Sequence, residues 1–137
     1  MNLIEKLLNR EFLIYLYVGG VTFIIYMAFI ALAVEILNSD YRVGVSVAYL
    51  FAVTFHFFAN RTVTFRAANY RLVDQSIRYI AILILNYLIT LMAVSFFVGS
   101  LGFSPYIGAV FAIVLTVAVG YFASKFWVFR ESKSLHD

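Results

Sequence analysis

Two stretches of this 137-residue chain carry cations and aromatic rings in the same order. Their residues are Asn60, Arg61, Phe65 and Arg66 and, 64 positions later, Ser124, Lys125, Phe129 and Arg130. Arginine and lysine make charge-assisted hydrogen bonds to phosphate oxygens, and aromatic rings can stack on an attached sugar. The repeated pairing of charge and ring therefore favours a phosphate site.

A plainer interpretation is that these cations anchor the chain's orientation in a membrane and that the rings form an interfacial belt. That interpretation explains the sign of the charge, but not why position, ring and spacing recur. We favour the phosphate site, with Arg78 completing it. The candidate residues from this argument are Asn60, Arg61, Arg66, Arg78, Lys125, Trp127 and Arg130.

A second group of polar residues falls inside apolar stretches. Thr22 and Tyr26 form one pair with helical spacing, and Asn86 and Thr90 form another. At 1.5 Å per helical residue, both pairs are expected near the middle of a bilayer. Asn86 is either part of a polar path or one end of a plain interhelical hydrogen bond. His56 is either a proton-sensitive group or a neutral hydrogen-bonded histidine.

The composition identifies the elements that must position these residues. Hydrophobic residues make up 64% of the chain and charged residues 12%, which is too apolar for a small soluble domain. We expect an all-α integral membrane protein that binds no nucleic acid. With no cysteine and two histidines at unrelated positions, we expect no metal and no cofactor. The absence of paired carboxylates or a Ser-His-Asp set argues against an enzyme.

Uncharged runs predict four transmembrane helices. They cover residues 12–34, 43–60 and 79–124, and the last run is divided near residues 99–105 by Gly, Ser and Pro. The polar segment 61–78 is expected to be the one sizeable loop. Residues 2–10 have apolar positions at helical spacing, which suits a short interfacial helix or a simple extension of the first span.

The distribution of cations predicts the orientation. Basic segments are retained in the cytoplasm, so both termini and the central loop are expected inside, with Arg42 alone outside. The predicted location is the cytoplasmic membrane, as a multi-pass protein with cytoplasmic N and C termini.

Residues 11–66 align without a gap on residues 75–130. This predicts two tandem helical hairpins in parallel orientation, as in transporters built from parallel repeats. Small residues recur four apart in the second helix of each repeat, beginning at Gly44 and Gly108. Such seams allow close helix packing, and we expect them to join the two second helices or two protomers. A homo-oligomer, most simply a dimer, is expected.

The four spans, the duplicated hairpin and the basic ends together resemble the GtrA-like family, in one domain covering residues 1–137. The matching residues are Gly19, Gly20, Asn60, Arg61, Thr64, Phe65, Lys125, Trp127 and Phe129. The resemblance thus adds Thr64 to the candidate site. Where the family often has Asn and then an acid after the paired glycines, this chain has Thr22 and Tyr26.

The resemblance implies movement of a polyprenyl-phosphate-linked sugar from the cytoplasmic to the outer leaflet, for modification of cell-surface polysaccharides. Membrane lipids and a polyprenyl-phosphate glycosyltransferase are the other implied partners. The alternative is a non-transporting membrane protein that anchors or stabilises such a glycosyltransferase. With no nucleotide-binding motif, we expect a facilitator. Proton coupling through His56 is the weaker hypothesis.

Overall fold

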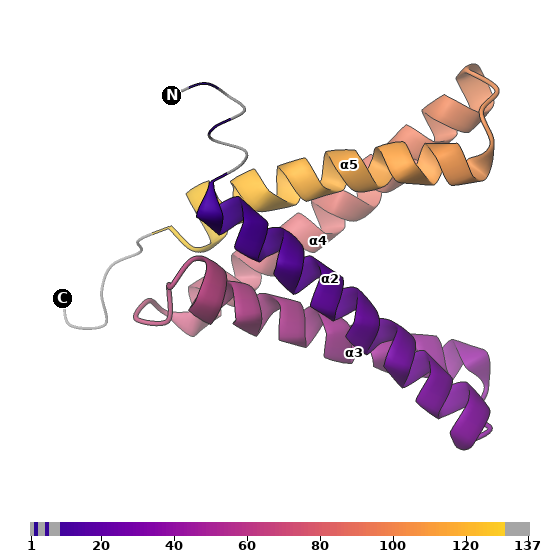
Figure 1. Cartoon of the computed structure of the whole chain (residues 1–137), viewed down its shortest axis with the longest axis horizontal. Helices are drawn as coiled ribbons and strands as arrows, with labels where there is room; N and C mark the ends of the chain where they lie inside the picture. The colour runs from indigo at the N-terminus through magenta and orange to yellow at the C-terminus, as the bar shows by residue number, and fades with distance from the viewer. Residues whose placement is uncertain (1, 3–4, 6–8, 131–137) are drawn as a thin grey trace. The chain divides into compact units, whose positions relative to one another are not determined.

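The computed structural model describes residues 2, 5 and 9–130, and these are helical with short connections (Figure 1). Four α-helices each continue into a five-residue π-helical segment. In order these are α2 (Arg10–Ala31), η1 (Leu32–Ile36), α3 (Tyr41–Ala59), η2 (Asn60–Thr64), α4 (Leu72–Ser95), η3 (Phe96–Ser100), α5 (Pro105–Ala123) and η4 (Ser124–Val128). The interfacial helix expected over residues 2–10 falls mostly outside the described residues.

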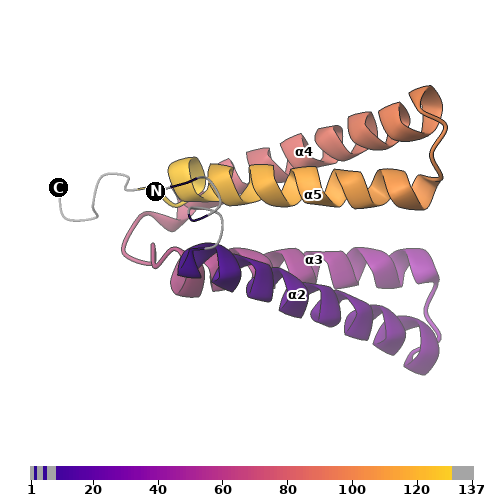
Figure 2. The same cartoon turned by 45° about the horizontal axis from the view of Figure 1, so that its top comes forward.

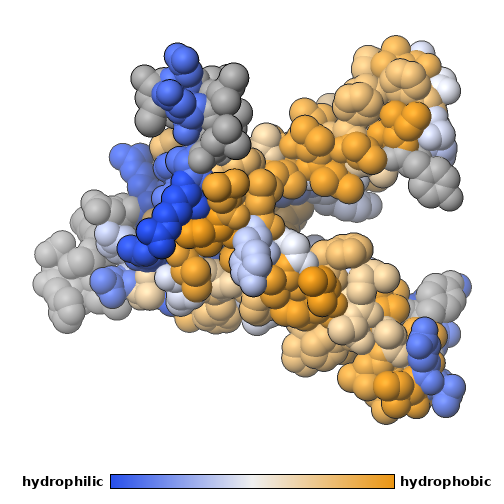
Figure 3. Space-filling model, viewed as in Figure 1, coloured by the Kyte–Doolittle hydropathy of each residue, from blue (hydrophilic) through white to orange (hydrophobic). Residues whose placement is uncertain are grey.

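Four continuous helical stretches are long and apolar enough to cross a membrane. They are Arg10–Ile36, Arg42–Thr64, Leu72–Ser100 and Ile107–Val128. The shortest has 22 residues, or about 33 Å of helix, against a hydrocarbon core of about 30 Å. Figure 3 shows apolar side chains along the helices and hydrophilic ones gathered at helix ends. The chain is a multi-pass membrane protein, which confirms the four predicted spans.

The predicted loop over residues 61–78 is too long. The second span continues through Thr64, and α4 already begins at Leu72. Helix is retained after Arg61 because the threonine hydroxyls are satisfied within it. Thr62 donates to the carbonyl oxygen of Phe58 at 2.7 Å, and Thr64 to the side-chain oxygen of Asn60 at 2.8 Å. A polar segment can thus extend a membrane helix when its hydroxyls bond locally.

The chain forms two compact units, Met1–Arg66 and Ala67–Asp137. The first is an antiparallel hairpin of α2 and α3, and the second is an antiparallel hairpin of α4 and α5 (Figures 1 and 2). A stacked aromatic pair joins the helices of each hairpin. The ring centroids of Phe29 and Phe51 lie 4.5 Å apart, and those of Phe97 and Phe111 lie 4.2 Å apart.

Glycine permits close approach near the turn of each hairpin. A Cβ atom added at Gly44 would lie 3.0 Å from the Cβ of Ala33, and one added at Gly108 would lie 3.2 Å from Cγ2 of Val98. Both neighbours belong to the same hairpin as the glycine. The expectation that the small-residue seam joins the two second helices or two protomers is therefore wrong at these positions. Here the seam packs against the first helix of its own hairpin.

Most corresponding elements of the two hairpins have bounds 64 residues apart, although α2 and α4 begin 62 residues apart. The 64-residue offset holds for α3 and α5, for η1 and η3, and for η2 and η4. Each π-helical segment ends with a backbone N–H bonded to the carbonyl five residues earlier, as from Phe65 to Asn60 at 2.9 Å and from Phe129 to Ser124 at 2.9 Å. These wide last turns satisfy carbonyl groups that a helix end otherwise leaves unpaired.

Candidate functional site

A buried chain of polar side chains links the end of α3 to η2. Asn60 is 1% exposed, and its Oδ1 accepts a 2.8 Å hydrogen bond from the hydroxyl of Thr64. Its Nδ2 donates to the carbonyl oxygen of His56 at 2.9 Å and lies 3.2 Å from the His56 ring nitrogen Nε2. Because the amide uses both its oxygen and its nitrogen internally, Asn60 has a structural role at the start of η2.

Tyr15 attaches α2 to this polar chain. Its ring meets the His56 ring edge-on, with centroids 5.7 Å apart, and lies 6.2 Å from the ring of Phe65. Tyr15 is itself buried. The start of α2 is therefore held against the end of the second span. The antiparallel hairpin requires this pairing, because the first residues of one helix meet the last residues of the other.

A small polar pocket lies where α2 begins and η2 ends. Its volume is about 270 Å³. From α2 it is lined by Arg10, Glu11 and Ile14, and from η2 and the two residues after it by Val63, Thr64, Phe65 and Arg66. The lining residues include two arginines, one glutamate and one threonine. Such a set can pair with an anion and also offers hydrogen bonds to neutral hydroxyl groups.

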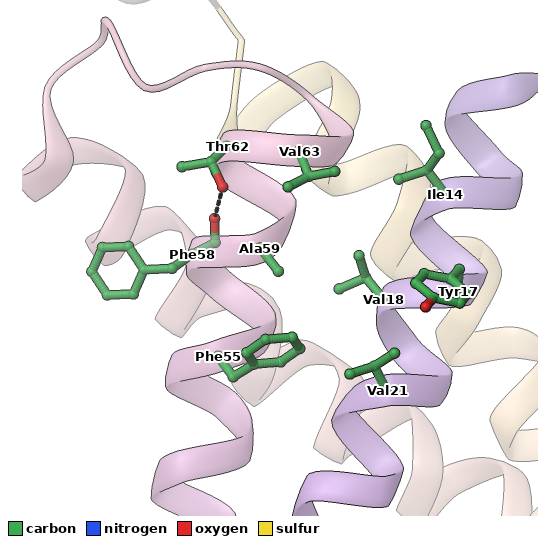
Figure 4. Close-up of a pocket in the computed structure, with 9 residues that line it drawn as sticks. All are labelled: Ile14, Tyr17, Val18, Val21, Phe55, Phe58, Ala59, Thr62 and Val63. Atoms are coloured by element: carbon green, nitrogen blue, oxygen red, sulfur yellow. Dashed lines mark hydrogen bonds between the residues drawn. The ribbon is translucent and has the colours of Figure 1, made fainter.

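An apolar groove of about 470 Å³ lies beside this pocket, between α2 and α3 (Figure 4). Its α2 wall consists of Ile14, Tyr17, Val18 and Val21. The opposite wall consists of Phe55, Phe58, Ala59, Thr62 and Val63. Figure 4 shows Val18 and Val21 pointing across to the second helix, whereas the ring of Phe58 points away from α2. The groove and the polar pocket share Ile14 and Val63.

The cations of the second hairpin make different contacts. Nη1 of Arg78, on α4, donates a 2.9 Å hydrogen bond to the backbone carbonyl of Trp127 on η4. Nζ of Lys125 lies 3.5 Å from the hydroxyl of Tyr121 and 5.7 Å from the ring centroids of Tyr121 and Phe126. Arg78 thus joins the two helices of its hairpin, while Lys125 rests on aromatic rings of its own helical stretch.

The structure unites only part of the predicted phosphate site. Thr64 and Arg66 line the polar pocket. Arg61 is half-buried on η2 and lines neither the pocket nor the groove. In the second hairpin Arg78 and Trp127 are joined by the hydrogen bond described above, and Arg130 is exposed after η4.

The polar residues predicted near mid-membrane mostly bond to their own helices. The hydroxyl of Thr22 donates to the carbonyl oxygen of Val18 at 2.7 Å, and that of Thr90 to the carbonyl oxygen of Asn86 at 2.9 Å. Tyr26 is half-buried. Within the described residues, Oδ1 of Asn86 is a buried oxygen that accepts no hydrogen bond. An acceptor in this state gains free energy when a donor reaches it.

Sequence reasoning missed Arg10, Glu11 and Gln75. Arg10 was assigned to the N-terminal extension and Glu11 was given no role, although an antiparallel hairpin of equal helices brings residues 10–14 beside residues 63–66. Gln75 is 1% exposed and donates to the carbonyl oxygen of Ala67 at 2.9 Å. No sequence signal marks Gln75. In the part of the chain that the structure describes, no cluster of three His, Asp or Glu side chains could hold a metal ion.

Comparison with known families gives one decisive match. The model of the GtrA/DPMS transmembrane domain covers residues 14–129. The chain belongs to this GtrA/DPMS family. The match spans both hairpins and includes both walls of the groove, and it confirms the resemblance seen in the sequence. No solved structure matches the chain.

Several curated proteins are similar to this GtrA/DPMS domain over most of their length. The cell wall teichoic acid glycosylation protein GtcA of Listeria monocytogenes is 24% identical, with 97% of this chain and 100% of that protein covered. GtcA of Listeria innocua is 23% identical, with 90% and 88% covered. The membrane protein YwcD of Bacillus subtilis is 25% identical, with 87% and 96% covered.

Proposed function

We propose that the protein moves a polyprenyl-phosphate-linked monosaccharide from the cytoplasmic to the outer leaflet of the cytoplasmic membrane, for glycosylation of a cell-surface polymer. The observation that carries this proposal is the polar pocket with Arg10 and Arg66 at the end of a membrane hairpin. Two guanidinium groups suit a lipid-linked phosphate. The names of the GtcA relatives, which refer to teichoic acid glycosylation, support the same kind of pathway.

The size and the other lining groups of the pocket favour a single sugar. Ligand pockets commonly measure about 300–1,000 Å³, so a volume of about 270 Å³ suits one sugar phosphate better than an oligosaccharide. Glu11 and Thr64 offer acceptor oxygens to sugar hydroxyl groups. In this proposal the arginines hold the phosphate, while Glu11 and Thr64 contact the sugar. Asn60 positions Thr64 through their hydrogen bond.

The sugar must then cross the apolar core, where unpaired polar groups cost several kcal/mol. We propose that Asn86 lowers this cost, because its buried Oδ1 accepts no hydrogen bond within the described residues and a sugar hydroxyl could donate one. Transport is proposed to be facilitated and driven by consumption of the sugar outside. The reaction is a movement between leaflets, without enzymatic chemistry.

The remaining parts of the proposal concern assembly and orientation. Cations near both termini and in the central connection favour cytoplasmic ends. The equal 64-residue offsets between elements of the two hairpins support tandem repeats that enter the membrane in the same direction. A homodimer is proposed as well, and its molecular mass in native lipid tests it.

Binding of undecaprenyl phosphate to the purified protein tests the phosphate site. We expect Arg66→Ala to weaken binding at least about tenfold, as for loss of a charge-assisted hydrogen bond worth roughly 1.5–3 kcal/mol. Arg42→Ala is the matched control, because Arg42 is an exposed arginine at the opposite end of the same hairpin. Equal affinities for wild type and both variants would refute the phosphate pocket.

The runner-up is a membrane protein that stabilises a polyprenyl-phosphate glycosyltransferase without transport. The exposed basic ends favour it, because they could serve as a docking surface. The two functions differ in their dependence on Asn86. The variant Asn86→Leu should leave a docking protein fully active in cells, but should slow a translocator.

A further inference from the structure

The apolar groove of the first hairpin has a geometry that the proposed function leaves unexplained. It opens between α2 and α3 and meets the polar pocket at Ile14 and Val63, which line both (Figure 4). An apolar path therefore ends at two guanidinium groups. This matches a molecule with one anionic end and one long hydrocarbon chain.

We propose that this groove seats the polyprenyl chain of the lipid whose phosphate lies in the Arg10 and Arg66 pocket. The proposal rests on the proposed function and extends it from the headgroup to the tail. A polyprenyl chain carries regularly spaced methyl branches, so it needs walls with room at intervals. On the α3 and η2 wall, the small side chain of Ala59 lies between the larger Phe55 and Val63, which offers room for such a branch.

The physical role of such a seat is orientation. Hydrocarbon gains no hydrophobic free energy on moving from lipid to an apolar groove, so only van der Waals packing favours the bound chain. A chain held between α2 and α3 fixes the direction in which its phosphate enters the pocket. The seat also leaves the rest of the long tail in the surrounding lipid.

The second hairpin differs at the corresponding place. Positions 64 residues after Ile14 and Val63 are Arg78 and Trp127, and Nη1 of Arg78 donates to the Trp127 carbonyl oxygen at 2.9 Å. A polar bond thus spans α4 and η4 where two branched aliphatic side chains border the groove of the first hairpin. This difference is the reason for placing the proposed tail seat in the first hairpin.

Filling the groove tests the proposal. The variant Ala59→Phe places a ring in the groove, and Ala123→Phe makes the same change 64 positions later, in the second hairpin. For each variant of the full chain, the affinity for undecaprenyl phosphate is compared with the affinity for dimethylallyl phosphate. The second compound has the phosphate but only a single isoprene unit. We expect Ala59→Phe to weaken the binding of undecaprenyl phosphate about tenfold or more. The affinity for dimethylallyl phosphate should stay unchanged. Ala123→Phe should change neither.

The failures of the two proposals are distinguishable. If Ala59→Phe leaves undecaprenyl phosphate binding unchanged while Arg66→Ala weakens it, the tail seat is wrong and the phosphate pocket stands. Equal weakening by Ala59→Phe and Ala123→Phe would also overturn the seat. If the wild type binds no undecaprenyl phosphate, the proposed function itself fails.

A measurement on the wild type removes any dependence on folding of the variants. A polyprenyl phosphate with a photoreactive group in its first isoprene units is crosslinked to the protein, and the labelled peptides are identified. Labelling of α2 and α3 near Val18 and Ala59 is expected. Labelling confined to α4 and α5 would overturn the proposal.

Discussion

Arg66, which lines the polar pocket of the first hairpin, has an unusual backbone conformation. Its φ angle is +50°, in the left-handed region that L-residues other than glycine and asparagine rarely adopt. In two other turns of the described residues, the position directly after the C-cap of the π-helical segment is occupied by Asn38 and Gly102. These residue types suit a positive φ angle. An arginine in this conformation costs more conformational free energy than asparagine or glycine would.

This suggests a variant with opposite effects on stability and binding. Arg66→Gly removes the backbone strain, and after the greater chain entropy of glycine is subtracted we expect a net gain of about 0.5–1 kcal/mol in unfolding free energy. The same variant loses the guanidinium group, so undecaprenyl phosphate binding should weaken as in Arg66→Ala. Thermal unfolding in detergent and lipid binding are measured side by side. Destabilisation together with unchanged binding would contradict both expectations.

At the scale of elements, each hairpin depends on close contact near its turn. Gly44→Ala brings a Cβ to 3.0 Å from the Cβ of Ala33, an atom fixed to its own backbone, so the helices must separate. We expect a loss of about 1–3 kcal/mol in unfolding free energy, as for overpacked sites. Gly19→Ala is the control, because nothing lies within 4 Å of its added Cβ. If both variants unfold at the same temperature, the contact at Gly44 contributes nothing.

The helices and the turns could be predicted from sequence because their signals are local. Uncharged runs identified the spans, and the Gly and Ser residues before Pro105, together with Pro105, identified the turn of the second hairpin. The extension of the second span beyond Arg61 could not be predicted in this way. The polar and basic composition argued for a loop, whereas hydrogen bonds from Thr62 and Thr64 into their own helix outweighed that signal.

The candidate site was harder to predict because it depends on pairing between helices. Arg66 was identified from the repeated motif, which also selected Lys125. Thr64 was added by the family resemblance, and Arg78 was added as a cation expected to complete the site. Arg78 instead hydrogen-bonds the backbone of its own hairpin, and Lys125 rests on Tyr121 and Phe126. Arg10 and Glu11 carry no motif. They enter the pocket because α2 runs antiparallel to α3.

At the scale of the whole molecule, the proposed function is that of a facilitator that binds two chemically opposite ends of one lipid. In this proposal the polar pocket of the first hairpin holds the phosphate, and the apolar groove beside it holds the chain. The second hairpin supplies a buried acceptor at Asn86. In this proposal the free-energy cost of moving the phosphate is lowered, because a phosphate paired with arginine at the membrane surface avoids much of the penalty of entering lipid unpaired.

Transbilayer movement in proteoliposomes tests the central claim most directly. An undecaprenyl-phosphate-linked sugar is placed in the inner leaflet, and its arrival outside is followed with an impermeant enzyme that modifies the sugar. The account predicts rapid arrival with the wild-type protein and without any nucleotide, and slower arrival with Arg66→Ala and Asn86→Leu. Arrival no faster than in protein-free vesicles would contradict translocation and favour a docking role beside a glycosyltransferase.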